Sequence, residues 1–133
     1  MMSEQPKVQL GINPKDLIGT KKPPLDLIPP SFEIHVAMAM KDGAKKYDPY
    51  NWRSNKVRAR VYVGAAKRHI AAWMDGQELA EDSGVHHLAH ASACMAILLD
   101  AQETGNLADD RPLPGAAAKL IERFTEKAAP KST

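Results

Sequence analysis

The feature that most constrains this chain is the run from Val85 to Glu103, which is rich in alanine and carries apolar side chains at helical spacing. Apolar residues three and four positions apart fall on one face of a helix, and the alanines between them let a second helix approach closely. Gly105 and Asn106 follow the run and are typical helix-ending residues. The run therefore predicts a central, closely packed helix. Its apolar stripe consists of Leu88, Ala91, Met95, Leu98 and Leu99.

Apolar spacing predicts three further helices. The first begins at Ser31, a typical N-cap residue, and ends at Gly43. Its buried stripe would be Ile34, Ala37 and Met38. The second covers residues 57–75; its opening residues alternate like a strand, but its length favours a helix. The last covers about residues 114–128. Together with the central helix they predict an all-α protein, a four-helix bundle.

Residues 11–30 hold five prolines, which exclude a regular helix or a central strand, so we expect an extended proline-rich arm there. We expect residues 1–10 to form a flexible tail and residues 11–128 a single domain, since 133 residues is the usual size of one domain. A bundle with several apolar, alanine-rich faces often completes its core by oligomerising, and we expect the same here.

The chain is 44% hydrophobic and 26% charged, which excludes wholesale disorder. A formal net charge of +2 favours anionic partners without singling out nucleic acid. Its one cysteine, Cys94, allows no intrachain disulfide, and no apolar run reaches the roughly 18 residues needed to cross a bilayer. We therefore expect a cytoplasmic protein without a membrane partner.

Carboxylate and imidazole side chains gather between residues 69 and 90. His87 and His90 lie three residues apart on one helix face and could hold one metal ion. Glu78 and Asp82 precede them and are oxygen ligands of the kind that Mg²⁺ or Mn²⁺ prefers. His69 is equally well explained as a hydrogen-bonded core residue, and Asp82 as a helix cap. The cluster predicts a divalent-metal site formed by Glu78, Asp82, His69, His87 and His90.

A second cluster is basic and aromatic. Aromatic faces stack on bases and cations bind phosphates, so this cluster and the lysines of the arm predict a nucleotide-binding surface. A solvated charged loop is the alternative. The candidate substrate-binding residues are Asn13, Lys15, Lys22, Lys45, Tyr47, Asn51, Trp52 and Arg68. The sequence lacks the signatures of phosphate loops, dinucleotide-binding turns, zinc ribbons and HExxH metalloproteases.

Several short stretches, taken in order, resemble one phage family. They are Asn13-Pro14-Lys15, residues 43–47, Asn51-Trp52, Arg68-His69 and residues 82–91. Their order and spacing across residues 11–105 are specific, although no single stretch is. The chain thereby resembles the MazG-like N-terminal domain of phage dATP/dGTP diphosphohydrolases.

The resemblance implies an all-α, MazG-like enzyme that depends on a divalent metal, Mg²⁺ or Mn²⁺. Such enzymes cut a purine deoxynucleoside triphosphate between its α- and β-phosphates, and they assemble as homodimers or homotetramers without a stable nucleic-acid partner. The implied catalytic residues are Glu78, Asp82 and His69. Within the family, the chain resembles the enzymes of phages that replace adenine by 2-aminoadenine. There, dGMP made from dGTP feeds 2-aminoadenine nucleotide synthesis.

The sequence departs from the usual MazG-like pattern of EExxE on one helix and ExxD on the next. Ala65, Ala66 and His69 stand at the first acidic positions, and His87 and His90 at the second. Either histidines replace some of the ligands, or carboxylates supply them from shifted positions. The carboxylates in question are Glu33, Glu78 and Asp82.

Two other functions compete with this one. A His/Asp-type hydrolase would release triphosphate using His69, Asp82 and His86 or His87, but the contiguous His-Asp pair of that class is missing. A single-stranded nucleic-acid-binding protein would use the aromatic cluster and nearby lysines. The modest net charge counts against it.

Overall fold

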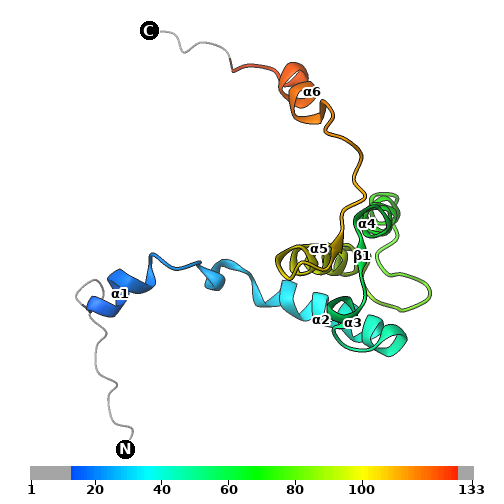
Figure 1. The fold of residues 1–133 in the computed structure, drawn as a ribbon, viewed down its shortest axis with the longest axis horizontal. Coiled ribbons are helices and arrows are strands. Elements are labelled where there is room, and N and C mark those ends of the chain that lie inside the picture. The colour runs from blue at the N-terminus through cyan, green and yellow to red at the C-terminus, as the bar shows by residue number, and fades with distance from the viewer. Residues whose placement is uncertain (1–12, 129–133) are drawn as a thin grey trace, which may run out of the picture.

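The computed structural model describes residues 13–128, and this part of the chain is mainly helical (Figure 1). The elements, in chain order, are α1 (Pro14–Gly19), the 3₁₀ turn η1 (Leu25–Leu27), α2 (Pro30–Tyr47), α3 (Asn51–Ser54), β1 (Val57–Arg58), α4 (Ala59–Met74), α5 (His87–Glu103), β2 (Leu107–Ala108) and α6 (Ala117–Phe124). The prediction of an all-α fold is confirmed, because the two strands in the described range have only two residues each.

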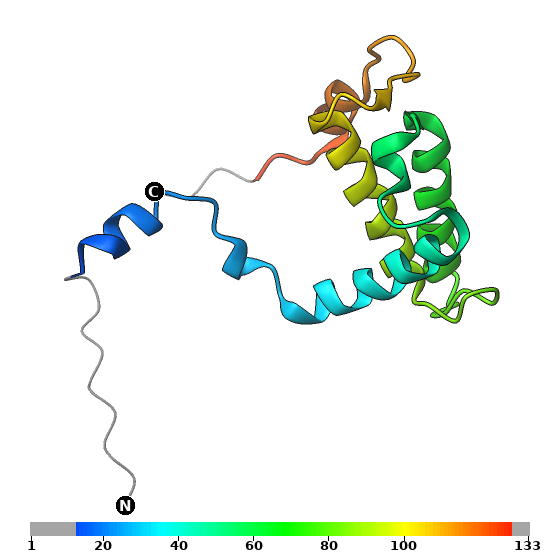
Figure 2. The same ribbon diagram turned by 60° about the horizontal axis from the view of Figure 1, so that its bottom comes forward.

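The centre of the fold is the antiparallel pair of α4 and α5, joined by residues 75–86 (Figure 2). We call residues 75–86 the connecting link. Most of the buried residues of the pair are alanines, and these small side chains leave room for the two helices to pack closely. The closely packed central helix predicted from the sequence is confirmed, but its predicted apolar stripe is not, because Met95 and Leu99 are 48% and 66% exposed. The buried alanines are Ala59 and Ala66 on α4 and Ala89, Ala91, Ala93 and Ala101 on α5.

Helix α2 packs across α5 from a second side. Ala39 of α2 is buried in a cluster with Ala89 and Ala93 of α5. Val36 and Met40 border this cluster. The predicted stripe was wrong for this helix, because Ile34 and Met38 are 66% and 48% exposed. The alanine surface of α5 accepts the small Ala39 at the point of closest approach, so the opposite face of α2 turns outward.

Helix α2 also extends further than predicted. It begins at Pro30 rather than Ser31 and continues through Gly43 to Tyr47. A single interior glycine costs a helix about 1 kcal/mol relative to alanine, which the surrounding turns offset. The helix ends where Asp48 takes a positive φ of 73°. This extension places the last turn of α2, with Lys46, beside α4 and α5.

The residues at the start of the predicted second helix that alternate like a strand do form one, but only over two residues. Val57 and Arg58 form β1, which pairs in parallel with Leu107 and Ala108 of β2. Val57 is 1% exposed, and its backbone N–H donates to the carbonyl of Asn106 at 3.0 Å. Helix α4 starts only at Ala59. The pairing ties the entry to α4 to the exit from α5.

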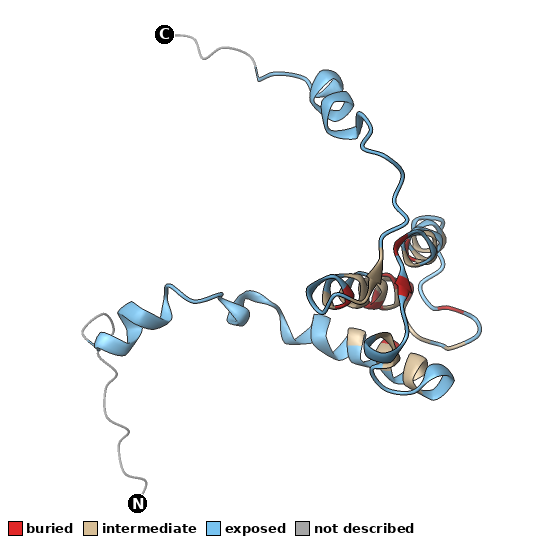
Figure 3. Ribbon diagram, in the orientation of Figure 1, coloured by how far each residue is buried: buried red, intermediate tan, exposed pale blue. Residues whose placement is uncertain are grey.

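The arm contains a short helix that the prolines were expected to exclude. Pro14 occupies the first turn of α1, where a missing N–H costs nothing, and the Asn13 side chain caps the helix by accepting from the N–H of Lys15 at 3.0 Å. From residue 13 to residue 35, every residue is exposed (Figure 3). The arm leads away from the helices along the direction of α2 (Figure 1).

The last helix does not complete a four-helix bundle. It covers Ala117–Phe124, less than the predicted 114–128, and all of its residues are exposed. Ile121 and Phe124 are 68% and 77% exposed, so the side predicted to be buried faces solvent. Leu113 and the prolines on either side of it carry the chain away from the packed helices. The packed body therefore consists of three long helices, α2, α4 and α5, together with the short α3.

None of the helices between residues 13 and 128 is long and apolar enough to span a membrane.

Candidate active site

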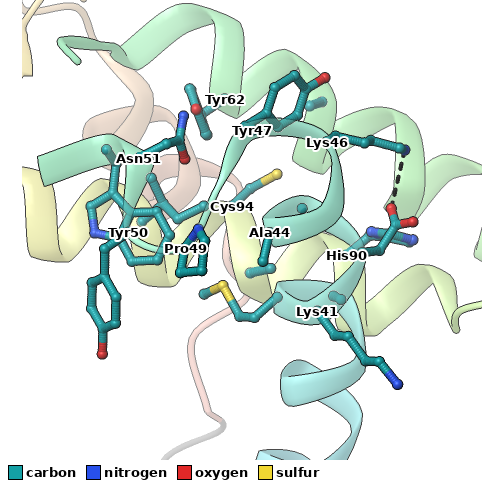
Figure 4. Close-up of a pocket in the computed structure, with 18 of the residues that line it drawn as sticks. Lys41, Ala44, Lys46, Tyr47, Pro49, Tyr50, Asn51, Tyr62, His90 and Cys94 are labelled. Carbon is teal, nitrogen blue, oxygen red and sulfur yellow. Dashed lines mark ion pairs between the residues drawn. The ribbon is translucent and has the colours of Figure 1, made fainter. Parts of the chain in front are cut away.

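The packed body contains a pocket of about 690 Å³ between α2, α3, α4 and α5 (Figure 4). The last turns of α2 and the turn after it form one wall. Tyr62, Ala65 and His69 of α4 and His90, Cys94 and Ile97 of α5 form the opposite wall. The volume lies within the usual range for small-molecule sites.

The two ends of the pocket differ in chemistry. Tyr50, Asn51 and Trp52 lie at one end, and the Tyr50 and Trp52 rings contact each other with centroids 5.0 Å apart. Lys46 and His90 lie at the other end (Figure 4). The pocket therefore has an aromatic end and a charged end.

Helix α3, which carries the aromatic end, is anchored to α5 by one carboxylate. Asp100 accepts from the indole N–H of Trp52 at 2.6 Å and from two guanidinium nitrogens of Arg53 at 2.6 and 2.9 Å. These contacts lower the pKa of Asp100, chiefly through the bond from Arg53 and then through that from Trp52. The Asn106 side chain adds hydrogen bonds to the carbonyls of Trp52 and Asn55. Four residues of helix are thereby fixed against the body.

Two non-glycine residues at the rim have a left-handed backbone. Asp48 has φ 73° and Tyr50 has φ 57°, and both line the pocket on either side of Pro49. Such conformations are disfavoured for residues with a Cβ and tend to occur at binding sites. Here they turn the chain from α2 into α3 and so shape the aromatic end.

At the charged end, one ammonium group meets two carboxylates. The Nζ of Lys46 lies 3.1 Å from Asp42 and 3.8 Å from Asp82. Figure 4 marks an ion pair of Lys46 with a dashed line. The hydrogen bond from Lys46 to Asp42 raises the pKa of the ammonium, so it stays charged. Asp42 and Asp82 come from α2 and the connecting link, so the cation joins two distant segments.

The three histidines His69, His87 and His90 lie together where α4 meets the start of α5. The Nδ1 atoms of His69 and His87 are 2.9 Å apart, and the rings of His69 and His90 stack with centroids 4.7 Å apart. His87 is buried at 6% exposure, whereas His69 and His90 line the pocket. The helical spacing of His87 and His90 thus brings both to His69, as the sequence predicted for a single site.

The connecting link holds these histidines by hydrogen bonds. Ser83 lies 2.7 Å from the Nε2 of His90, and the side chain of Gln77 lies 2.6 Å from the Nε2 of His87. Ser83 also accepts from the N–H of Val85 at 3.2 Å. A polar link therefore fixes the ring orientations of two helical histidines.

Burial decides the protonation of the groups in the pocket wall. Burial lowers the pKa of His69, and the neighbouring His90 and His87 lower it further. Burial also lowers the pKa of His90, although Asp42 and Asp82 act in the opposite direction. Both rings are therefore neutral near pH 7 and each keeps one nitrogen lone pair. Burial raises the pKa of the Tyr62 phenol and of the Cys94 thiol, so both stay protonated.

Of the residues predicted from sequence, six line this pocket. They are Tyr47, Asn51, Trp52, His69, Asp82 and His90. Lys45 of α2 and Arg68 of α4 do not line the pocket. His87 does not line it either, but it contacts His69. Asn13, Lys15 and Lys22 lie in the exposed arm and do not line the pocket.

The carboxylate of Glu78 bonds to two residues that do not line the pocket. Its Oε2 accepts from the indole N–H of Trp73 at 3.2 Å and lies 3.0 Å from the Nε2 of His86. His86 in turn caps α5, because its Nδ1 accepts from the N–H of Leu88. This arrangement gives Glu78 and His86 a structural task at the start of α5.

Sequence reasoning missed two pocket residues of consequence, Asp42 and Tyr62. Asp42 was overlooked because the first helix was expected to end at Gly43, which hid the i, i+4 relation of Asp42 to Lys46. Tyr62 of α4 also lines the pocket, but it was not among the residues predicted to bind substrate. A helix drawn through Gly43 would have revealed the first of these.

The predicted five-ligand metal site is not assembled as one group. Within residues 13–128, no three His, Cys, Asp or Glu side chains are placed to hold one ion together. Both ring nitrogens of His87 have partners, His69 and Gln77. The carboxylates of Asp42 and Asp82 both lie within 4 Å of the ammonium of Lys46.

Comparison with known proteins defines the class to which this site belongs. The model of the family "dATP/dGTP diphosphohydrolase, N-terminal" matches residues 13–111, and the chain belongs to this family. The matched range includes every residue that lines the pocket and leaves α6 outside.

A dATP/dGTP diphosphohydrolase of Salmonella phage PMBT28 is 31% identical to this chain over 102 residues. The alignment covers 77% of this chain and 34% of the relative, so the chain spans about a third of the length of that protein. No solved structure matches the chain.

Proposed function

We propose that this chain hydrolyses purine deoxynucleoside triphosphates, converting dGTP to dGMP and pyrophosphate with the help of Mg²⁺ or Mn²⁺. GTP and dATP are further candidate substrates. The observation that carries the proposal is the pocket with one aromatic and one charged end, which suits the two halves of a nucleotide. The family match and the name of the phage relative support the same class of enzyme.

The aromatic end would receive the base. Tyr50 and Trp52 offer ring faces for stacking, which is sequence-tolerant and contributes about 1–3 kcal/mol per base. The amide of Asn51 has donors and an acceptor that can pair with the edge of a purine. The triphosphate would then extend toward Lys41 and Lys46 at the charged end.

The carboxylates of Asp42 and Asp82 fit a divalent metal, because they already share one cation, the ammonium of Lys46. Mg²⁺ is commonly held by one or two carboxylates together with water and substrate phosphates, so three protein ligands are not required. We propose that these two residues hold the metal, with His90 beside them. When bound, the metal supplies neutralisation of the phosphate charge.

Glu78 and His87 are left out of this ligand set because the Oε2 of Glu78 and both ring nitrogens of His87 are bonded to other side chains. His69 was predicted both as a ligand and as a catalytic residue, and we keep only its catalytic role.

In the reaction, the oxygen of a water molecule joins the α-phosphorus, and the bond from that phosphorus to the α,β-bridging oxygen breaks. The bridging oxygen leaves with pyrophosphate. We propose that His69 accepts the proton released by the attacking water, since it lines the pocket and its neutral ring keeps a lone pair. Lys46 would offset phosphate charge, whereas the substrate contact expected of Arg68 has no pocket contact to support it. Neither the catalytic role expected of Glu78 nor the substrate contact expected of Lys45 has a pocket contact to support it.

The proposed biological setting is a phage that replaces adenine by 2-aminoadenine, in the cytoplasm of its host. There, dGMP would be the starting material for the modified nucleotide. This part of the proposal rests on the resemblance of the motifs between residues 13 and 91.

We also propose that the working unit is a homodimer or homotetramer. Exposed apolar side chains on several faces of the body support an oligomer, among them Ile34, Val61 and Leu99. The arm bears further ones at Leu17 and Leu27. Within an oligomer, the arm of one copy would bring Asn13, Lys15 and Lys22 to the pocket of another.

The decisive experiment incubates the purified chain with dGTP, dATP, dCTP and dTTP, in the presence of Mg²⁺, Mn²⁺ or EDTA, and separates the products by chromatography. We expect metal-dependent release of monophosphate and pyrophosphate, fastest with dGTP. Release of nucleoside and triphosphate would instead assign the chain to the His/Asp-type hydrolases. Absence of turnover, with salt-dependent binding of oligonucleotides, would favour the nucleic-acid-binding function.

Two variants test the assigned roles. His69→Gln should lower kcat by at least about 100-fold, in line with the usual contribution of a general base. Asp82→Asn should also lower kcat, because it removes one of the two carboxylates proposed to hold the metal. His35→Gln is the matched control, because His35 is exposed on α2 and does not line the pocket. Circular dichroism should show the same helix content in all three variants. Full activity of His69→Gln would remove that residue from the reaction.

A further inference from the structure

A chain of hydrogen bonds runs from the connecting link to the proposed base. The Nε2 of Gln77 donates to the carboxylate of Glu81 at 3.3 Å. A carboxylate only accepts, so this contact orients the amide and leaves its Oε1 facing His87, 2.6 Å from that Nε2. Because a carbonyl oxygen also only accepts, His87 must carry a hydrogen on Nε2.

The second step follows from the count of hydrogens on a neutral imidazole. When His87 carries a single ring hydrogen, that hydrogen is on Nε2, and the bare Nδ1 lies 2.9 Å from the Nδ1 of His69. The contact is a hydrogen bond only if His69 donates from Nδ1. Neutral His69 then keeps its lone pair on Nε2. The ring nitrogen that this series of hydrogen bonds leaves free is therefore the Nε2 of His69, the histidine that lines the pocket.

We propose that Gln77 is a positioning residue that acts through His87 to fix the tautomer of His69, so that Nε2 is the nitrogen that accepts the proton. The proposal rests on the function proposed above, in which His69 is the base. Partners that orient a functional histidine from behind commonly change activity by about 10–100-fold when they are removed. Gln77 does not line the pocket, so its effect would be transmitted by His87 alone.

The same arrangement accounts for the hydrogen bonding of a buried histidine. His87 is the one buried polar side chain found between residues 13 and 128, and both of its ring nitrogens have partners. A buried imidazole without partners would lose the hydrogen bonds that water gives it in the unfolded chain. The ring of His90 stacks on one face of the His69 ring and restrains its orientation.

The test is ¹⁵N NMR of the full chain labelled at histidine, with the five histidines assigned by single substitutions. At neutral pH, in the absence of nucleotide, we expect His69 to carry its hydrogen on Nδ1 and His87 to carry its hydrogen on Nε2. A His69 ring with its hydrogen on Nε2 would overturn the inference, whatever the turnover.

Two substitutions extend the test to activity. Gln77→Leu removes the acceptor, and we expect kcat for dGTP to fall by about 10–100-fold with little change in KM. The His69 spectrum should then show a mixture of tautomers. Gln77→Glu keeps an acceptor for His87 and should retain the wild-type tautomers and most of kcat. Unchanged tautomers and unchanged kcat in Gln77→Leu would contradict the proposal.

The NMR measurement separates this inference from the proposed function. A wild-type chain with the expected tautomers but with no need of His69 for turnover would disprove the role of the base and leave the hydrogen-bond chain intact. If Gln77→Leu does not fold, the tautomers of the wild-type chain still decide whether the link fixes the ring.

Discussion

Cys94 is the single cysteine of the chain, and its thiol lies in the pocket wall. Because burial raises the pKa of this thiol, little thiolate forms near pH 7. We expect N-ethylmaleimide to react more slowly with Cys94 than with free cysteine, and saturating dGTP to slow the reaction further. Mass spectrometry of timed samples measures both rates. Rapid labelling that dGTP leaves unchanged would place the nucleotide outside this pocket.

Lys46 carries the ammonium group at the charged end of the pocket. Its ammonium neutralises Asp42 and Asp82 in the free protein and would contact phosphate in the complex. We expect Lys46→Met to raise the KM for dGTP about tenfold, corresponding to a loss of about 1.4 kcal/mol. Lys67→Met is the matched control, since Lys67 lies on α4 and does not line the pocket. Equal kinetic constants for the two variants would argue against a phosphate contact of Lys46.

At the scale of the elements, one carboxylate of α5, that of Asp100, accepts hydrogen bonds from two side chains of α3. The pKa of Asp100 is lowered below its ordinary 3.8 in the folded protein, so its stabilising contacts are present above that pH and are lost as the pH falls through the lowered value. We expect Asp100→Asn to lower the Tm at pH 7 and to flatten the acid limb of the Tm profile below pH 4. Differential scanning calorimetry from pH 2 to pH 7 measures both effects. A parallel shift at all pH values would mean that the carboxylate charge is not responsible.

Helix α4 has one weak point, Gly64. A Cβ at this position would lie 3.3 Å from the end of the flexible Arg68 side chain, which is exposed and can move. Alanine in a helix is favoured over glycine by roughly 0.8–1 kcal/mol. We therefore expect Gly64→Ala to raise the free energy of unfolding by about that amount in urea titrations. Destabilisation would show that Arg68 is held in place more firmly than its exposure indicates.

The sequence predicted elements best where apolar periodicity and packing coincide. The alanines of α5 mark a helix that others approach closely, and this is what the structure contains. The same periodicity misjudged α2, because apolar residues lie on more than one of its faces and only the partner decides which face is buried. It also placed α6 in the bundle, since an amphipathic pattern does not specify the surface that covers it.

The candidate site was predictable where residues share one helix and less so where segments meet. His87 and His90 were grouped by their spacing, and His69 by its place on the neighbouring helix. The pairing of Asp42 with Asp82 through Lys46 joins α2 to the connecting link, and no local pattern encodes it. The aromatic end was predicted because its residues are consecutive.

At the scale of the whole molecule, the arm and α6 extend from the body (Figure 1), and the body leaves apolar side chains exposed. We expect size-exclusion chromatography with light scattering to give a mass of two or four chains of 14.5 kDa. A monomer at micromolar concentration would contradict the proposed oligomer.

The arm itself can be tested by the double substitution Lys15→Ala/Lys22→Ala. If the arm reaches the pocket of another copy, KM for dGTP should rise several-fold while the oligomeric mass and kcat stay the same. Lys119→Ala/Lys127→Ala, on and after the exposed α6, is the matched control. An identical KM in both double variants would restrict the arm to a role in assembly.

The contacts that tie the aromatic end to α5 join residues distant in the chain: Arg53 bonds to Asp100 across 47 positions, and Asn106 bonds to Trp52 across 54. Closing a loop of this length costs conformational entropy, and the contacts stabilise the fold only once the loop has closed. The α4–α5 hairpin closes across the much shorter connecting link, and local contacts form faster than distant ones. Refolding should therefore produce the histidine cluster before the aromatic end. Recovery of native Trp52 fluorescence would then lag behind recovery of helical circular dichroism.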